Sequence, residues 1–478
     1  MPDPNHAASP FQLLLTPERA ALAADGANTL RVLVRVQAPA QPADPTAQAA
    51  RRDPLHLALV LDRSGSMAGA PLQEAKHCAC HIVDQLGADD RAAIVAFDSE
   101  VELVAPLTAG SQKAALRIAI DGIGEAGCTN LHGGWRAGAD ELAGKLSAAG
   151  IHRVVLLSDG CANEGETALE VISGQCRDLA RAGVSTSTYG LGNDFNEDLM
   201  LAMARAGRGN AYYGDTAADL AEPFAAEFAL LTNLCARGLV LKVNAPDVVG
   251  VRLRNDYEAV ADGVAAWKLP DLAYAAEAWA VVEFELPVGT IGALDAAGTG
   301  MPGDTARGSG DGASADNDTA GRVTLPVTVS LEAAGRDSAP VFLMAALPPL
   351  PVVSAAELAA MPADEAVARR VVELDAAAML DELRAAIAVD NWERAQRLLE
   401  DAQARFAAHE WASAILATMR KLVADRDARR SMKEASYSSS RMANRLVMAS
   451  EAEGPMACEA ALPLYLQRKG AQGKGRRA

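Results

Sequence analysis

Five apolar residues lead directly into a polar turn in the segment LALVLDRSGSM, residues 57–67. A continuous apolar run that ends in turn residues is typical of a strand buried on both faces, as in a parallel sheet covered by helices. The turn then lies at the carboxyl end of the strand, which is the edge where open α/β sheets bind ligands. Its oxygen-bearing residues alternate as Asp62, Ser64 and Ser66, so we expect these three side chains to converge on one point. Gly65 between them permits the tight backbone that this convergence requires.

The sequence around this segment, from Leu55 to about Leu234, consists of short apolar runs separated by amphipathic stretches. The predicted strands are residues 55–61, 92–97, 101–107, 154–157 and 184–189. Only residues 98–100 join the second strand to the third, which is too short for a crossover helix, so we expect an antiparallel hairpin at the sheet edge. The pattern predicts an α/β domain over residues 54–235, with a doubly wound, mostly parallel, Rossmann-like sheet.

Strand-like segments lie on both sides of this domain. Residues 30–37 largely alternate between apolar and polar side chains, and further strand-like segments lie between residues 239 and 347. Because strands need hydrogen-bonded neighbours, we expect residues 1–53 to join residues 236–350 in one β-sandwich, into which the α/β domain is inserted. Residues 288–322 are rich in Gly, Ala, Asp, Ser and Thr, which predicts a flexible excursion between two strands.

The C-terminal part is predicted to be helical. Apolar residues recur there at intervals of three and four, as in Trp392, Ala395 and Leu399. This spacing predicts a helical hairpin or three-helix segment within residues 351–450. Residues 451–478 form a mixed tail that ends in basic residues, for which we expect a solvated end.

The composition restricts the functions that the chain can have. Half of the 478 residues are hydrophobic, and 44 basic against 62 acidic residues give a formal net charge of −18. Such a chain is expected to be globular and not to bind nucleic acid, since duplex binding needs a dense basic face. An odd number of cysteines favours a reducing compartment. Residues 1–10 lack the pattern of a secretory signal and every later apolar run is short, so we expect a cytoplasmic protein without a membrane span.

Two further polar segments are expected at the same edge of the sheet. The first is GCTN, residues 127–130, and the second is SDG, residues 158–160, which follows a predicted strand. Their Thr129 and Asp159 add hydroxyl and carboxylate oxygens without His or Cys, a ligand set that suits a small hard cation. Mg²⁺ is the first choice, with Mn²⁺ and Ca²⁺ as alternatives. A purely structural alternative is that Asp62 and the serines cap the following helix while Asp159 forms a turn.

These motifs resemble the metal-ion-dependent adhesion site of von Willebrand factor type A domains, over roughly residues 55–234. Asp62, Ser64 and Ser66 fit the Asp-x-Ser-x-Ser motif, Thr129 fits the second loop of that site, and Asp159 fits the third. More loosely, the whole chain resembles larger bacterial proteins with this domain and the calcium-activated chloride channel-like and inter-alpha-trypsin inhibitor heavy chain groups. The resemblance implies a divalent metal held by these five residues, with an open coordination position for a carboxylate from a partner protein.

The expected function is therefore metal-dependent interaction with a protein partner that presents an Asp or Glu. The alternative is a non-catalytic subunit of an ATPase-driven machine, resembling the metal-chelatase subunits that carry this domain. The ATPase would then be a separate protein, because the sequence contains no phosphate-binding loop. We expect no enzymatic activity, since there is no Gly-x-Ser-x-Gly elbow and no nucleophile with an evident base.

Overall fold

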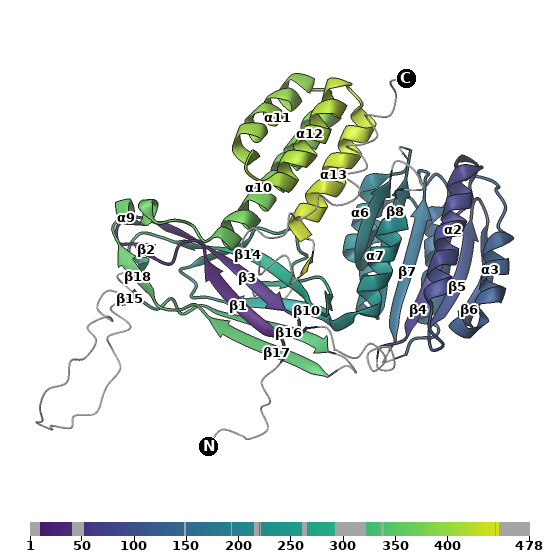
Figure 1. The fold of residues 1–478 in the computed structure, drawn as a ribbon, viewed down its shortest axis with the longest axis horizontal. Coiled ribbons are helices and arrows are strands. Elements are labelled where there is room, and N and C mark those ends of the chain that lie inside the picture. Colours follow the sequence, from purple (N-terminus) through teal and green to yellow (C-terminus); the bar gives the residue numbers. More distant parts are fainter. Residues whose placement is uncertain are drawn as a thin grey trace, which may run out of the picture.

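A computed structural model describes residues 10–40, 52–147, 150–192, 194–214, 219, 221–260, 265–291, 322–335, 339–444 and 446–448. Figure 1 shows an α/β domain on one side of the molecule, a β-sandwich on the other, and a bundle of helices above the sandwich. The expected fold class is confirmed. The tail 451–478 and most of the expected excursion, residues 292–321, lie outside the described residues.

The α/β domain is built on a six-stranded sheet with the strand order β6-β5-β4-β7-β8-β9. Its strands are β4 (Leu55–Asp62), β5 (Arg91–Phe97), β6 (Val101–Ala109), β7 (Ile151–Ser158), β8 (Val184–Leu191) and β9 (Arg208–Gly214). β6 runs antiparallel to β5 at one edge, and the other neighbouring strands are parallel. The edge hairpin expected from the short connection is confirmed. β9 was not predicted, because its sequence, RGNAYYG, has no continuous apolar run.

Helices cover both faces of this sheet. One face is covered by α2 (Ala70–Gln85), α3 (Lys113–Asp121) and α7 (Ala221–Thr232), and the other by α4 (Leu131–Ala143), α5 (Leu169–Arg181) and α6 (Glu197–Ala206). The alternation along β4 explains why: Leu57 and Leu59 face the first set of helices, whereas Ala58 and Val60 face the second. Short 3₁₀ turns, η1 (Gly65–Met67) and η2 (Gly110–Gln112), complete the domain.

The β-sandwich combines strands from before and after the α/β domain. One sheet contains β1 (Gln12–Pro17), β3 (Asn28–Gln37), β14 (Ala276–Leu286), β11 (Gly250–Leu253) and β19 (Val447–Met448). The other contains β12 (Ala265–Lys268), β10 (Leu234–Asn244), β16 (Thr328–Gly335), β17 (Pro340–Ala346) and β13 (Leu272–Ala273), and a small sheet contains β15 (Arg322–Val323), β18 (Leu350–Val353) and β2 (Leu22–Ala23). Because β3 pairs along its whole length with β14, the α/β domain is an insertion between paired strands of one sheet.

Between β18 and β19, the described part of the chain forms five helices: α9 (Ala355–Ala360), α10 (Glu365–Ala388), α11 (Trp392–Phe406), α12 (Glu410–Ala424) and α13 (Ala428–Asn444). The bundle of α10 to α13 packs on the outer face of the first sheet, where Leu33, Trp279 and Val281 join its hydrophobic core. The number of helices is larger than the two or three that the sequence predicted. The expected range also begins with strand β18. No described helix is long and apolar enough to cross a bilayer.

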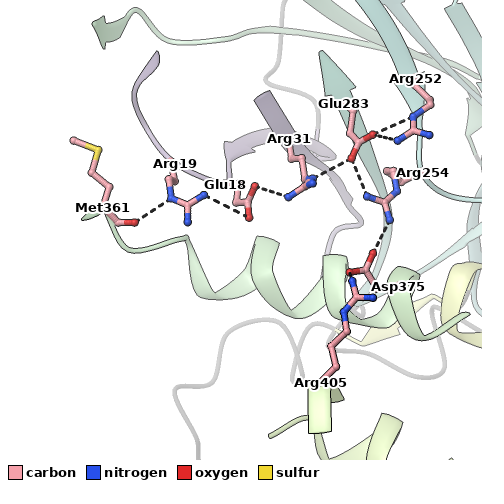
Figure 2. Close-up of polar contacts among 9 residues, drawn as sticks. All are labelled: Glu18, Arg19, Arg31, Arg252, Arg254, Glu283, Met361, Asp375 and Arg405. Atoms are coloured by element: carbon pink, nitrogen blue, oxygen red, sulfur yellow. Dashed lines mark hydrogen bonds and ion pairs between the residues drawn. The ribbon is translucent and has the colours of Figure 1, made fainter. Parts of the chain in front are cut away.

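A network of ion pairs joins the first sheet to this bundle, as Figure 2 shows. Glu283 of β14 accepts hydrogen bonds from Arg31 of β3, from Arg252 of β11, and from Arg254. Arg254 also donates to Asp375 of α10 at 2.7 Å. The charged side chains on the outer face of this sheet therefore bind the sheet to the helical bundle.

Candidate metal centre

The first loop of the site begins where β4 ends, at Asp62. The carboxylate of Asp62 is fully buried, and its Oδ1 accepts a hydrogen bond from the backbone N–H of Ser64 at 2.8 Å. Its Oδ2 accepts a hydrogen bond from the hydroxyl of Ser158, at the end of the neighbouring strand β7. Both oxygens of Asp62 thus fix the backbone and the strand end that surround the site.

The oxygens of the first and third loops lie close together. Ser64 Oγ is 3.2 Å from Ser66 Oγ, and Ser66 Oγ donates to Asp159 Oδ1 at 2.7 Å. Two ligands at right angles on an octahedral Mg²⁺, with bonds of 2.0–2.1 Å, are about 2.9 Å apart. The spacing of these three oxygens therefore suits neighbouring ligands of one small cation.

Thr129, from the second loop, faces the same space beside Gly160. A side-chain carbon built on Gly160 would lie 3.0 Å from Thr129 Oγ1 and 3.5 Å from Ser66 Oγ. The absence of a side chain at this position keeps the space between the two hydroxyls open. The structure thus brings together all five residues that the sequence motifs selected: Asp62, Ser64, Ser66, Thr129 and Asp159.

The second loop is positioned by close packing of the helix that follows it. Asn130 caps α4 by accepting a hydrogen bond from the N–H of Gly133 at 2.9 Å. A side-chain carbon at Gly134 would lie 2.4 Å from the ring of Phe97, so α4 can approach β5 this closely only with glycine there. This approach brings Thr129, which precedes the N-cap residue Asn130, to the edge of the sheet.

Hydrogen bonds also tie the three loops to one another. The N–H of Gly65 donates to the carbonyl of Gly127, which joins the first loop to the second. The N–H of Thr129 donates to Asn163 Oδ1 at 2.9 Å, which joins the second loop to the third. Arg63, within the first loop, pairs with Asp98 at 2.6 Å, so the β5–β6 hairpin also supports the site. These bonds join the three loops that carry the five oxygen-bearing residues.

The site concentrates negative charge. Burial raises the pKa of Asp62, and the Asp98 carboxylate adds to this increase. Burial also raises the pKa of Asp159 to about 6, with a further contribution from the Asp62 carboxylate. Two neighbouring carboxylates are costly to ionise together, and a bound divalent cation would make their ionisation favourable. The residues present therefore fit a hard divalent cation.

The hydroxyls are needed to complete such a site. Among the described residues, no group of three or more His, Cys, Asp or Glu side chains is placed to hold a metal. Two aspartates alone offer too few ligands, whereas Ser64, Ser66 and Thr129 add oxygens without adding charge. Water molecules or an external carboxylate would fill the remaining positions.

Four residues that support the site have no role in the sequence motifs: Ser158, Gly160, Asp98 and Asn163. Ser158 and Gly160 flank Asp159 in the sequence, so their place beside the site follows from the strand ending there. Asp98 pairs with Arg63, and Asn163 accepts a hydrogen bond from Thr129. Both contacts join loops that come together only when the sheet has formed. No local pattern distinguishes these two from ordinary loop residues.

The fold and this site define a class of doubly wound α/β domains that gather hydroxyl and carboxylate oxygens at one edge of the sheet. Residues 56–226 match the von Willebrand factor type A domain family. The chain therefore contains a von Willebrand factor type A domain, inserted into a β-sandwich and followed by a helical bundle.

Two relatives illustrate the extent of the similarity. An uncharacterized protein of Synechocystis sp. is 30% identical over 188 residues, covering 38% of this chain and 43% of the relative. Inter-alpha-trypsin inhibitor heavy chain H3 of Homo sapiens is 28% identical over 179 residues, covering 35% of this chain and 20% of the relative. The chain thus spans less than half of the length of these relatives.

Two solved structures resemble most of the chain. The von Willebrand factor type A protein from Catenulispora acidiphila has a TM-score of 0.57 at 18% identity, covering 85% of this chain and 88% of that one. The ArnB paralog VWA2 from Sulfolobus acidocaldarius has a TM-score of 0.56 at 16% identity, covering 90% and 98%. The similarity of fold therefore extends beyond the α/β domain.

Proposed function

We propose that this chain is a metal-dependent protein-interaction module. Mg²⁺ would be held by Asp62, Ser64, Ser66, Thr129 and Asp159, and an Asp or Glu of a partner protein would complete its coordination. The observation that carries this proposal is the convergence of oxygens from three separate loops around the open space beside Gly160.

Charge explains why an acidic partner is the natural ligand. The two aspartates balance the two charges of the cation, and the three hydroxyls donate no charge. A carboxylate from outside is then a stronger ligand than water at the remaining position. The site is also accessible, because Ser66 lies exposed at its rim.

The proposed role is recognition and not catalysis. Without a cation, burial raises the pKa of both aspartates at the site, that of Asp159 to about 6. A bound divalent cation lowers the pKa of a neighbouring carboxylate, because it stabilises the charged form. Asp159 would then act as a ligand and not accept a proton at neutral pH.

Titration with Mn²⁺, followed by electron paramagnetic resonance, tests the site directly. We expect one bound ion, with affinity strongly reduced in Ser66→Ala and Asp62→Ala. Asp178→Ala is the matched control, since it removes an exposed carboxylate on α5 of the same domain. Equal Mn²⁺ affinity in Asp62→Ala, Asp178→Ala and the unmodified chain would contradict the site.

Partner capture tests the second half of the proposal. Immobilised chain should retain a partner in Mg²⁺, and should release it when a chelator is added. Asp62→Ala should retain none, with the fold verified by circular dichroism, whereas Asp178→Ala should behave as the unmodified chain. A partner that is retained despite both the chelator and Asp62→Ala would show that recognition does not pass through the metal.

A further inference from the structure

One face of helix α13 contacts the α/β domain through residues spaced four apart: Arg429, Lys433 and Tyr437. Residues at this spacing lie on the same side of a helix. Arg429 pairs with Asp194 at 2.6 Å. Tyr437 packs against Phe195 and Tyr213, with ring centroids 6.3 Å and 5.5 Å away. All three contacts reach the loop after β8 or the neighbouring strand β9.

Lys433, in the middle of this face, is buried against that loop. Its side chain is 2% exposed, and its Nζ donates to the backbone carbonyl of Phe195 at 2.5 Å. The same nitrogen lies 3.1 Å from Glu197 Oε2 and 3.5 Å from the centroid of the Phe195 ring. A buried ammonium is costly unless several partners surround it, so these contacts fix the position of the loop relative to the helix.

The other side of the same loop is bonded to the third loop of the metal site. The thiol of Cys161 donates to the backbone carbonyl of Asp194 at 2.7 Å. Cys161 follows Asp159 by two residues and Gly160 by one. Asp194 therefore contacts α13 through its side chain and the metal loop through its backbone.

We infer that Lys433 of α13 is a positioning residue for the metal site, and acts through the adjoining backbone of Phe195 and Asp194, and then through Cys161, on the loop that carries Asp159. This inference rests on the proposed metal site and adds a role for the helical bundle. Coupling between two equilibria is reciprocal, so a helix that improves metal binding when docked is itself held more firmly when metal binds. Ligand binding at the sheet edge would then be transmitted to the bundle.

The test compares Lys433→Met with Arg384→Ala. Arg384 of α10 pairs with Asp198 across the same interface, and its pair lies outside the loop that Cys161 contacts. We expect Lys433→Met to raise the dissociation constant for Mn²⁺ by roughly three- to tenfold, and Arg384→Ala to leave it within about twofold. In metal-free protein, amide exchange of residues 158–164 should also become faster in Lys433→Met and not in Arg384→Ala.

Variants at Cys161 test the path. Cys161→Ala removes the bond to Asp194, so it should weaken Mn²⁺ binding, and adding Lys433→Met to it should produce little further loss. Cys161→Ser keeps a donor and should lose less affinity than Cys161→Ala. Full additivity of the two losses would show that Lys433 does not act through Cys161 and would overturn the proposed path.

The inference is overturned if Lys433→Met folds and changes neither the Mn²⁺ dissociation constant nor the exchange of residues 158–164. Should that variant fail to fold, Arg429→Ala replaces it, since Arg429 is exposed and its loss should act in the same direction. An unchanged Mn²⁺ affinity in Arg429→Ala then overturns the inference. If the unmodified chain binds Mn²⁺ no better than Asp62→Ala, it is the metal site itself that is wrong.

Discussion

At Gly160, a hydrogen atom in place of a side chain keeps open the space that Ser66 and Thr129 face. A methyl group there would lie 3.0 Å from Thr129 Oγ1 and would fill this space. Both hydroxyls are carried by short side chains, so neither can move far from this space. The residue thus controls the site although it supplies no ligand.

Replacement of Gly160 by alanine should therefore weaken Mn²⁺ binding by about 10- to 100-fold, as changes next to metal ligands commonly do. Gly174→Ala is the control, because a side-chain carbon at Gly174, on α5, would meet no atom within 4 Å. Calorimetric titration of both variants measures the difference. If Gly160→Ala binds Mn²⁺ as tightly as Gly174→Ala, the space beside residue 160 does not hold the ion.

Among the elements, β14 connects the sandwich to the helical bundle through Glu283. Burial acts to raise the pKa of Glu283, but hydrogen bonds from Arg252, Arg254 and Arg31 outweigh it and lower the pKa to about 2. A carboxyl with a lowered pKa stabilises the fold above its ordinary pKa of about 4.5, and this contribution is lost as the pH falls toward 2.

We expect Glu283→Gln to lower the free energy of unfolding at pH 7 by about 1–2 kcal/mol, because solvent around the arginines screens part of the interaction. The difference from the unmodified chain should shrink as the pH falls from about 4.5 to about 2. Urea unfolding at a series of pH values measures it, with Glu332→Gln, an exposed partner of Lys242 in the other sheet, as control. A difference that stays constant over this pH range would exclude the ion pairs as its source.

Across the whole molecule, ion pairs recur where the α/β domain meets the sandwich and the bundle. They include Arg177 with Glu258, Arg384 with Asp198, and Arg429 with Asp194. Such polar interfaces between domains allow relative motion more readily than apolar ones. Exposed ion pairs also weaken as salt screens them.

The radius of gyration from small-angle X-ray scattering should therefore increase between low salt and about 1 M NaCl, while the secondary structure is retained. The double variant with Arg384→Ala and Arg429→Ala should show the larger radius already at low salt. An identical radius under all these conditions would mean that apolar contacts, such as those of Tyr437, hold the domains together.

The sequence determined the α/β domain and its candidate ligands, because each depends on local pattern. Apolar runs buried on both faces identify β4 and β7, and in a parallel sheet the residues after such strands meet at one edge. Asp62 and Asp159 could therefore be placed together from the sequence, whereas Thr129 was assigned to the site from its place before a helix and from the resemblance to the adhesion site. The pairing of the N-terminal strands with later ones followed from the same need of strands for neighbours.

The distant segments that support that edge could be identified only from the folded chain. Helix α13 has polar residues such as Lys433 and Ser431 in buried positions, so no apolar stripe in its sequence predicted either the helix or its partner. The contacts of Asp98, Asn163 and Cys161 likewise join loops that are far apart in the chain. A polar side chain can be buried only where the fold places hydrogen-bonding or charged partners around it, and these come from distant parts of the chain. The apolar pattern of a buried strand, in contrast, is visible in consecutive residues.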